Sequence, residues 1–176
     1  MNIVLTEIKE NIAVVTIDNP PVNALSHVVR SGVSDAIQEL CKDTSVKAII
    51  LICEGRTFCA GADISEFGKP PLSPSLSNLM AKMDQINKPL IAAIHGTALG
   101  GGFELALGCH YRIMIEGAKV GLPEVNLGLI PGAGGTQRLP RLIGVAAALE
   151  MITSGKPISA RKAFEVGVVD RICDNN

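Results

Sequence analysis

The chain has 176 residues, a formal net charge of −1 and 47% hydrophobic residues, with no Trp, one Tyr and four Phe. This length predicts one domain with a substantial aliphatic core, and the charge gives no basic field for nucleic acid. The apolar runs are too short for a bilayer and the first residues show no secretory signal, so we expect no membrane partner. Five cysteines without CxxC spacing and three histidines without metal-ligand spacing favour an intracellular, metal-free protein.

Alternating strands and helices are predicted along the first part of the chain. Apolar runs at 3–8 and 12–17, parted by Lys-Glu-Asn, indicate a hairpin. Ser26 is a typical N-cap residue, and apolar residues at helical spacing after it predict a helix up to residue 42. The run 48–53 is apolar at every position, which is typical of a strand in a buried parallel sheet. This order favours an α/β fold with right-handed crossovers.

An irregular loop is predicted at 54–64, directly after the buried strand. Open α/β sheets place ligands beyond the carboxyl ends of their strands, and the small residues at 60–62 allow a ligand to approach the main chain closely. The Pro- and Ser-rich stretch 68–77 predicts a surface segment, followed by a short helix before Lys88. We therefore expect the loop 54–64 to face a ligand.

The stretch 90–109 carries the clearest sign of chemistry. An apolar strand at 90–94 leads to Gly100, Gly101 and Gly102, and a helical pattern follows. The start of a helix offers unpaired N–H donors and the positive end of a dipole, which together attract an oxyanion. Because Glu104 lies one turn into this helix, we expect its carboxylate beside those donors.

The rest of the chain is predicted to form strands and then helices. Strands are expected at 111–115 and 119–121, and a second candidate acid, Glu124, follows them. The stretch 122–136 is too rich in Gly and Pro for regular structure but has five large aliphatic residues, so it predicts an apolar loop that lines a cleft. Further along, helices are predicted at 137–142, 146–154 and 159–166, and a last strand at 168–172.

Each candidate residue also has an ordinary structural explanation. A Glu in the first turn of a helix commonly complements the dipole, and Glu124, which follows a proline, fits a solvated loop. Gly100–Gly102 match neither the dinucleotide-binding nor the P-loop pattern, which argues against nucleotide hydrolysis and dinucleotide redox chemistry. Cys59 lies in the ligand loop without assignable His and carboxylate partners, which argues against a nucleophile.

Four motifs occur in order along the chain. They are FCAGADI at 58–64, IHGTALGGGFELA at 94–106, LPE at 122–124 and PGAGGTQRL at 131–139. Together they resemble the enoyl-CoA hydratase/isomerase (crotonase) family over nearly the whole of 1–176. The run ELALGCHYRI at 104–113 with GLPEV at 121–125 is more similar still to one branch. That branch is the N-terminal hydratase/isomerase part of bifunctional enzymes that carry a 3-hydroxyacyl-CoA dehydrogenase downstream.

The resemblance implies a spiral of ββα units and an acyl-CoA thioester substrate, with no cofactor because CoA is part of the substrate. It assigns the backbone N–H groups of Ala62 and Gly101 to an oxyanion hole. It assigns Glu104 and Glu124 to acid–base catalysis on one water held between them: Glu104 helps to activate the water for attack at C3, and Glu124 supplies the proton at C2. The residues implied along the path of the substrate are Ala62, Asp63, Ile64, Ser65 and Gly101.

The reaction implied is hydration of trans-2-enoyl-CoA to 3-hydroxyacyl-CoA in fatty-acid β-oxidation, because two carboxylates serve hydration best. Two alternatives stay open: an enoyl-CoA Δ-isomerase or another crotonase-type reaction, and a non-catalytic module that binds acyl-CoA. Family members continue with helices that cover the acyl pocket and build a trimer. We therefore expect residues 1–176 to be the core of a longer chain and not to include these helices. The compartment implied is the bacterial cytoplasm, or the peroxisome of a eukaryote.

Overall fold

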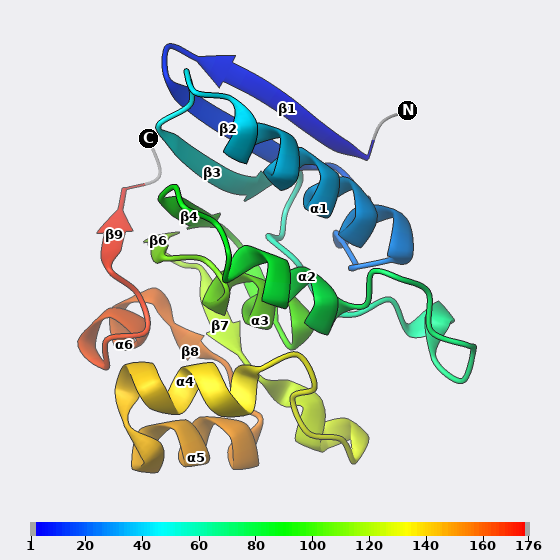
Figure 1. Ribbon diagram of the computed structural model, residues 1–176. Helices are drawn as coiled ribbons and strands as arrows, with labels where there is room; N and C mark the ends of the chain where they lie inside the picture. Colours follow the sequence, from blue (N-terminus) through cyan, green and yellow to red (C-terminus); the bar gives the residue numbers. More distant parts are fainter. Residues whose placement is uncertain (1–2, 175–176) are drawn as a thin grey trace.

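Two sheets organise the chain in the computed structural model, which describes residues 3–174 (Figure 1). The larger sheet has the order β1-β2-β3-β4-β6-β9, and only the β1–β2 pair is antiparallel. The smaller sheet has the order β5-β7-β8. The strands of the larger sheet are β1 (Val4–Lys9), β2 (Ile12–Ile17), β3 (Ala48–Cys53), β4 (Leu90–Ile94), β6 (Tyr111–Ile115) and β9 (Arg171–Cys173). Those of the smaller sheet are β5 (Thr97–Leu99), β7 (Lys119–Gly121) and β8 (Ile158–Ser159).

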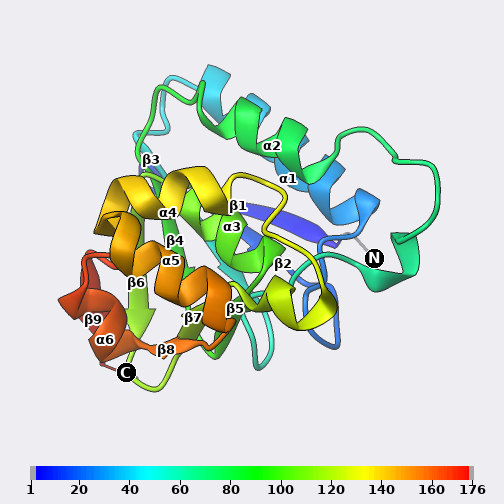
Figure 2. The same cartoon turned by 90° about the horizontal axis from the view of Figure 1, so that it is seen from below.

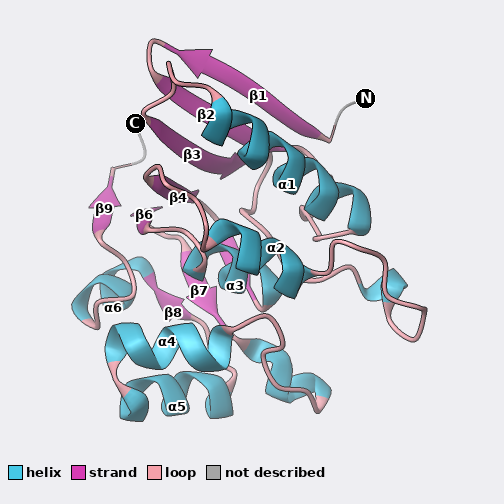
Figure 3. Cartoon of the chain, viewed as in Figure 1, coloured by secondary structure: helices cyan, strands magenta, loops and turns pink. Residues whose placement is uncertain are grey.

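Helices pack around these sheets (Figure 3). They are α1 (His27–Lys42), α2 (Leu76–Met83), α3 (Gly101–Leu107), α4 (Gly135–Ile143), α5 (Val145–Ser154) and α6 (Ala160–Glu165). Two 3-10 helices, η1 (Ile64–Glu66) and η2 (Pro123–Leu127), lie in the loops. Viewed from below, α3 lies between the α1–α2 pair and the α4–α5 pair (Figure 2). Every residue of α3 is buried, so the Gly-rich turn before it sits in the interior.

Sequence patterning accounts for most of these elements. In β3, fully buried side chains such as Ile49 and Leu51 alternate with half-buried ones, as expected for a strand with layers on both faces. In α1, the Ser26 side chain accepts a hydrogen bond from the N–H of Val29 and so caps the helix where its spacing predicted. The predicted hairpin, α1, β3 and β4 are confirmed.

The structure corrects two predictions along the second half of the chain and adds two short strands. The stretch 122–136, expected to be irregular throughout, contains η2, because Pro123 suits the first position of a helical turn. The predicted strand 168–172 is a buried turn followed by β9, since Val168 and Val169 pack into the core before pairing begins. The short strands β5 and β8 show no strand pattern in the sequence, and their pairing partners lie far along the chain.

Among residues 3–174, no helix combines the length and the apolar character needed to cross a bilayer.

Candidate active site

A cleft of about 350 Å³ opens where the predicted ligand loop, the start of α3 and the loop around η2 meet. Its lining residues include Ala60, Gly61, Ala62, Ile64, Gly100, Gly101, Glu104, Glu124 and most of the apolar stretch 127–133. Leu127, Leu129 and Ile130 are largely exposed there, as expected for an apolar loop at a cleft. The fold therefore brings residues from all four sequence motifs to one cavity.

Two main-chain segments approach each other at the cleft wall. A Cβ atom on Gly101 would lie 3.3 Å from the backbone nitrogen of Ala62, a tight contact that shows how close the two segments are. Gly101 is the first residue of α3, where N–H groups lack an intrahelical acceptor. Within residues 3–174, the Ala62 N–H meets no hydrogen-bond acceptor. The main chain of Ala62 and that of Gly101 therefore lie close together at the wall of the cleft.

The Ala62 main chain is held in position by its neighbours. The N–H of Leu25 donates to the Gly61 carbonyl at 2.9 Å, and the N–H of Ala60 donates to the Val22 carbonyl at 3.0 Å. Leu25 and Ala62 form an isolated parallel bridge. The segment before α1 therefore fixes the loop that carries Ala62.

Glu104 is 2% exposed and its carboxylate is held by a distant loop. Its Oε1 accepts hydrogen bonds from the N–H groups of Ala133 and Gly135, both at 2.8 Å. Glu104 lines the same cleft as Gly100 and Gly101, but the donors that hold its Oε1 come from the turn at the start of α4. Burial raises the pKa of Glu104 above its usual value, although these two bonds and the Arg138 charge act in the opposite direction.

Glu124 lies on η2, across the cleft from α3. Its Oε2 is buried and has no hydrogen-bond partner among the described residues. A Cβ atom on Gly100 would lie 3.1 Å from Oε1 of Glu124, and the φ of +51° at Gly100 also favours glycine. Burial raises the pKa of Glu124, a hydrogen bond from its own backbone lowers it, and the Glu104 charge raises it further. A buried carboxyl oxygen without a partner lowers the stability of the fold, so its presence points to a function.

Replacing Glu124 with glutamine is expected to stabilise the fold at neutral pH. Since folding raises the pKa of this carboxyl, its charged form costs stability, and the cost grows as the pH rises through the folded-state pKa. Urea unfolding should therefore show a gain for Glu124→Gln at neutral pH that shrinks below the ordinary Glu value of 4.5. Glu116→Gln, at an exposed position, serves as the control. A gain of equal size at both pH values would contradict the assignment of the cost to the charge.

The three residues after Ala62 differ in what they line. Asp63 caps η1, since its Oδ1 accepts from the N–H of Ser65 at 2.9 Å, and hydrogen bonds from Ser65 lower the pKa of Asp63. Ile64 is 74% exposed and lines the cleft. Asp63 lines a second cavity of about 240 Å³ beside it, whereas Ser65 is exposed and lines neither.

Cys59 and the histidines have structural contacts. Cys59 is fully buried, and burial raises the pKa of its thiol to about 12, which agrees with its exclusion as a nucleophile. His27 and His95 contact backbone carbonyls through Nε2, and His110 Nδ1 accepts from the N–H of Leu90. Within residues 3–174, no group of three His, Cys, Asp or Glu side chains could hold a metal ion.

Several residues of the cleft were not found from the sequence. The N–H groups of Ala133 and Gly135 hold Glu104, and the side chains of Leu76 and Ser77 from α2 complete the wall. The glycine run in PGAGGTQRL was a signal for Ala133 and Gly135, because such a run marks backbone that approaches a neighbour closely. A Cβ on Gly135 would lie 3.0 Å from Oε1 of Glu104.

Comparison with known proteins agrees with this geometry. A sequence profile described as Enoyl-CoA hydratase/isomerase matches residues 7–176. The peroxisomal bifunctional enzyme of Danio rerio is 51% identical over 169 residues, which are 96% of this chain and 24% of that protein. The probable enoyl-CoA hydratase of Bacillus subtilis is 49% identical over 176 residues, 96% of this chain and 68% of that protein. This chain thus spans only 24% of the bifunctional relative.

Solved structures give the same result. The crystal structure of enoyl-CoA hydratase from Bacillus anthracis superposes with a TM-score of 0.91 at 36% identity, covering 98% of this chain and 70% of that one. DspI of Pseudomonas aeruginosa gives a TM-score of 0.93 at 32% identity, covering 100% and 70%. The predicted crotonase-like α/β fold is therefore confirmed, and the chain belongs to the enoyl-CoA hydratase/isomerase family.

Proposed function

We propose that this chain hydrates trans-2-enoyl-CoA thioesters to 3-hydroxyacyl-CoA, a step of fatty-acid β-oxidation. The strongest support comes from the groups that line the cleft. Two carboxyl groups with raised pKa values, Glu104 and Glu124, line it together with the main chain of Ala62 and Gly101. Names of relatives such as "Probable enoyl-CoA hydratase" support the same reaction.

The N–H groups of Ala62 and Gly101 are proposed to bind the thioester oxygen. Attack at C3 of the conjugated thioester moves electron density onto that oxygen, and two fixed N–H donors stabilise the enolate-like charge. One such donor is typically worth roughly 3 kcal/mol of barrier. Because the donors belong to the backbone, side-chain substitution does not remove them directly.

Glu104 and Glu124 are proposed to hold one water between them. The bonds from Ala133 and Gly135 occupy Oε1 of Glu104, which leaves Oε2 for the water. The water oxygen bonds to C3 while Glu104 takes one of its protons, and the unpartnered carboxyl of Glu124 gives a proton to C2. Proton exchange with solvent then returns both groups to their starting states, so that one water has been added. Carboxyl pKa values raised toward neutrality suit such transfers.

The rest of the site is proposed to bind the substrate, which brings its own CoA, so no further cofactor is required. Ala62 and Ile64 line the cleft, which supports the assignment of residues 62–65 to the CoA arm, and Leu127, Leu129 and Ile130 are proposed to form an apolar wall for the acyl chain. Relatives named as peroxisomal support a peroxisomal location for a eukaryotic source, and we propose the cytoplasm for a bacterial one.

The test follows the ultraviolet absorbance of trans-2-butenoyl-CoA, which falls when water adds across the conjugated double bond. We expect saturable turnover to 3-hydroxybutanoyl-CoA. In a parallel assay with trans-3-hexenoyl-CoA, formation of the conjugated product without hydration would assign an isomerase instead. Tight binding of the thioester without turnover in either assay would assign a binding module.

A further inference from the structure

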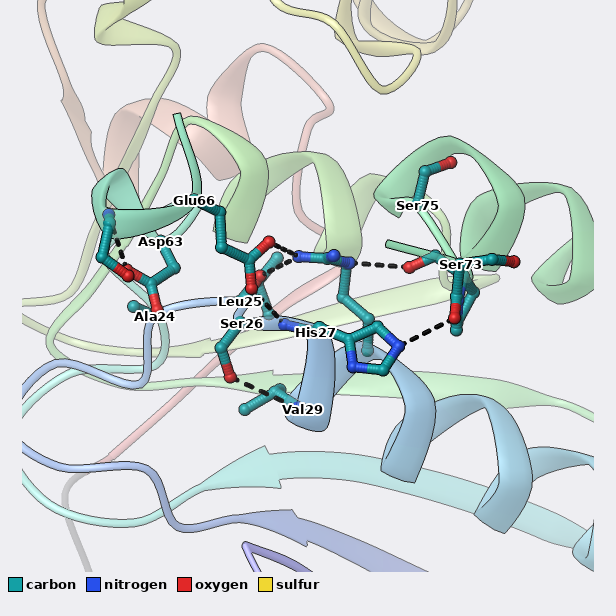
Figure 4. A network of polar contacts seen from close by, with 12 residues as sticks. Ala24, Leu25, Ser26, His27, Val29, Asp63, Glu66, Ser73 and Ser75 are labelled. Atoms are coloured by element: carbon teal, nitrogen blue, oxygen red, sulfur yellow. Dashed lines mark hydrogen bonds and ion pairs between the residues drawn. The ribbon is translucent and has the colours of Figure 1, made fainter. Parts of the chain in front are cut away.

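A buried arginine near the start of α1 binds three separate parts of the chain. Arg30 is 7% exposed, and its Nε donates to the Pro74 carbonyl at 2.8 Å. Its Nη1 donates to the Leu25 carbonyl at 2.6 Å and to Oε2 of Glu66 at 2.8 Å. Figure 4 shows this network between the start of α1 and the segment that carries Asp63, Glu66 and Ser73.

Glu66 completes the attachment with its second oxygen. Oε1 accepts from the backbone N–H of His27 at 2.6 Å, in the first turn of α1. The His27 ring in turn contacts the Ser73 carbonyl through Nε2 at 2.8 Å. The first turn of α1 therefore holds the segment 63–74 at both ends, through Glu66 near its start and through Ser73 and Pro74 at its end.

The segment 63–74 has little apolar anchorage of its own. Ile64, Phe67 and Leu72 are 74%, 52% and 55% exposed, and the segment projects from the body at the right of Figure 1. A backbone with few buried side chains opens easily unless polar contacts hold it. Because the Arg30 guanidinium is nearly buried, loss of its carboxylate partner would also leave a desolvated charge.

This segment forms a wall of the substrate site. It lines the cavity of about 240 Å³ beside the cleft, through Asp63, Phe67 and Leu72. Arg30 and Glu66 lie in the wall of the same cavity. Ala62, Phe67 and Leu76 line both this cavity and the catalytic cleft, so the two lie next to each other. A part of the thioester that enters this cavity from the oxyanion hole would therefore contact the segment 63–74.

We propose that Arg30 and Glu66 are positioning residues that hold the segment 63–74 against α1 and so preform the wall that binds the CoA arm. This proposal rests on the proposed function. A preformed wall lowers the ordering cost of binding, while the acid–base groups stand elsewhere in the cleft. The network should therefore govern KM and leave kcat nearly unchanged.

The test compares Arg30→Met, Arg30→Lys and Glu66→Gln with the wild type in the hydration assay. We expect Arg30→Met and Glu66→Gln to raise KM for trans-2-butenoyl-CoA roughly tenfold, with kcat within about threefold. Arg30→Lys keeps the charge but has a single nitrogen in place of Nε and Nη1, so it cannot reach all three acceptors in the same geometry and should rescue only in part. The double variant should show a smaller rise in KM than the product of the single rises, because both substitutions break one network.

A truncated substrate separates positioning from general damage. The N-acetylcysteamine thioester of trans-2-butenoate lacks the nucleotide end of CoA, and its KM should be the same for these variants and the wild type. An equal rise in KM for both substrates, or an unchanged KM for trans-2-butenoyl-CoA, would overturn the proposal.

Arg112 provides a matched control. It is 3% exposed, pairs with the half-exposed Asp170 at 3.4 Å and donates to the carbonyls of Val168 and Cys109, but it lines neither cavity. Arg112→Lys should lower the melting temperature as Arg30→Lys does and leave KM unchanged.

If the wild type binds trans-2-butenoyl-CoA without turnover, the same comparison is made on Kd, and the proposed reaction alone fails. If the wild type does not bind it, both proposals fail.

Discussion

Replacing Glu104 with glutamine is expected to lower kcat for enoyl-CoA hydration by about 10²–10⁴-fold, the usual contribution of a general acid or base. The fold should survive, because a glutamine amide oxygen can still accept the two N–H bonds that Ala133 and Gly135 now make to Oε1. The amide cannot take a proton from the water. Steady-state kinetics with trans-2-butenoyl-CoA measure the loss, and circular dichroism checks the fold.

Glu124→Gln should lose activity to a similar extent, since it removes the proton that Glu124 is proposed to give to C2. The two carboxyl groups act on one water, so the kcat of the double variant should be only slightly lower than that of the less active single variant. Glu116→Gln is the control, because Glu116 is exposed in a surface ion pair with Arg161, and its kcat should match the wild type. A Glu104→Gln variant that hydrates at the wild-type rate would remove Glu104 from the reaction.

Gly102→Ala is expected to lower the free energy of unfolding by about 3 kcal/mol, the upper end of the usual range for overpacking. A Cβ on Gly102 would lie 2.7 Å from both Cβ and Sγ of Cys59 and would also press on the Cys59 carbonyl. A main-chain carbonyl cannot rotate away as a long side chain can. The same shift would displace the loop that carries Ala62, so kcat should fall as well.

Gly132→Ala is the control for this substitution. Gly132 is exposed, and a Cβ there would meet nothing within 4 Å, so urea unfolding should give a stability within about 0.5 kcal/mol of the wild type. Wild-type stability in Gly102→Ala would show that the contact with Cys59 relaxes, and would contradict the view that this turn is rigidly packed.

The local pattern of the sequence was sufficient to predict the elements whose structure depends on neighbours along the chain. The Ser26 cap, the length of α1 and the alternation in β3 follow from helical and strand periods together with the burial of apolar side chains. The corrections fall on short elements. Strands β5 and β8 have too few residues to show a period, and they exist because β7 pairs with both.

For the candidate site, the sequence by itself determined which residues to consider. Gly100–Gly102 mark a turn that needs small residues, and the ordered motifs mark Ala62, Glu104 and Glu124. Only the tertiary structure decided what holds these groups. Glu104 is bound by the N–H groups of Ala133 and Gly135, and Arg30 joins α1 to Glu66 and Pro74. Hydrogen bonds of this kind join residues about 30 to 44 positions apart, so their partners depend on how the whole chain packs and leave no local pattern in the sequence.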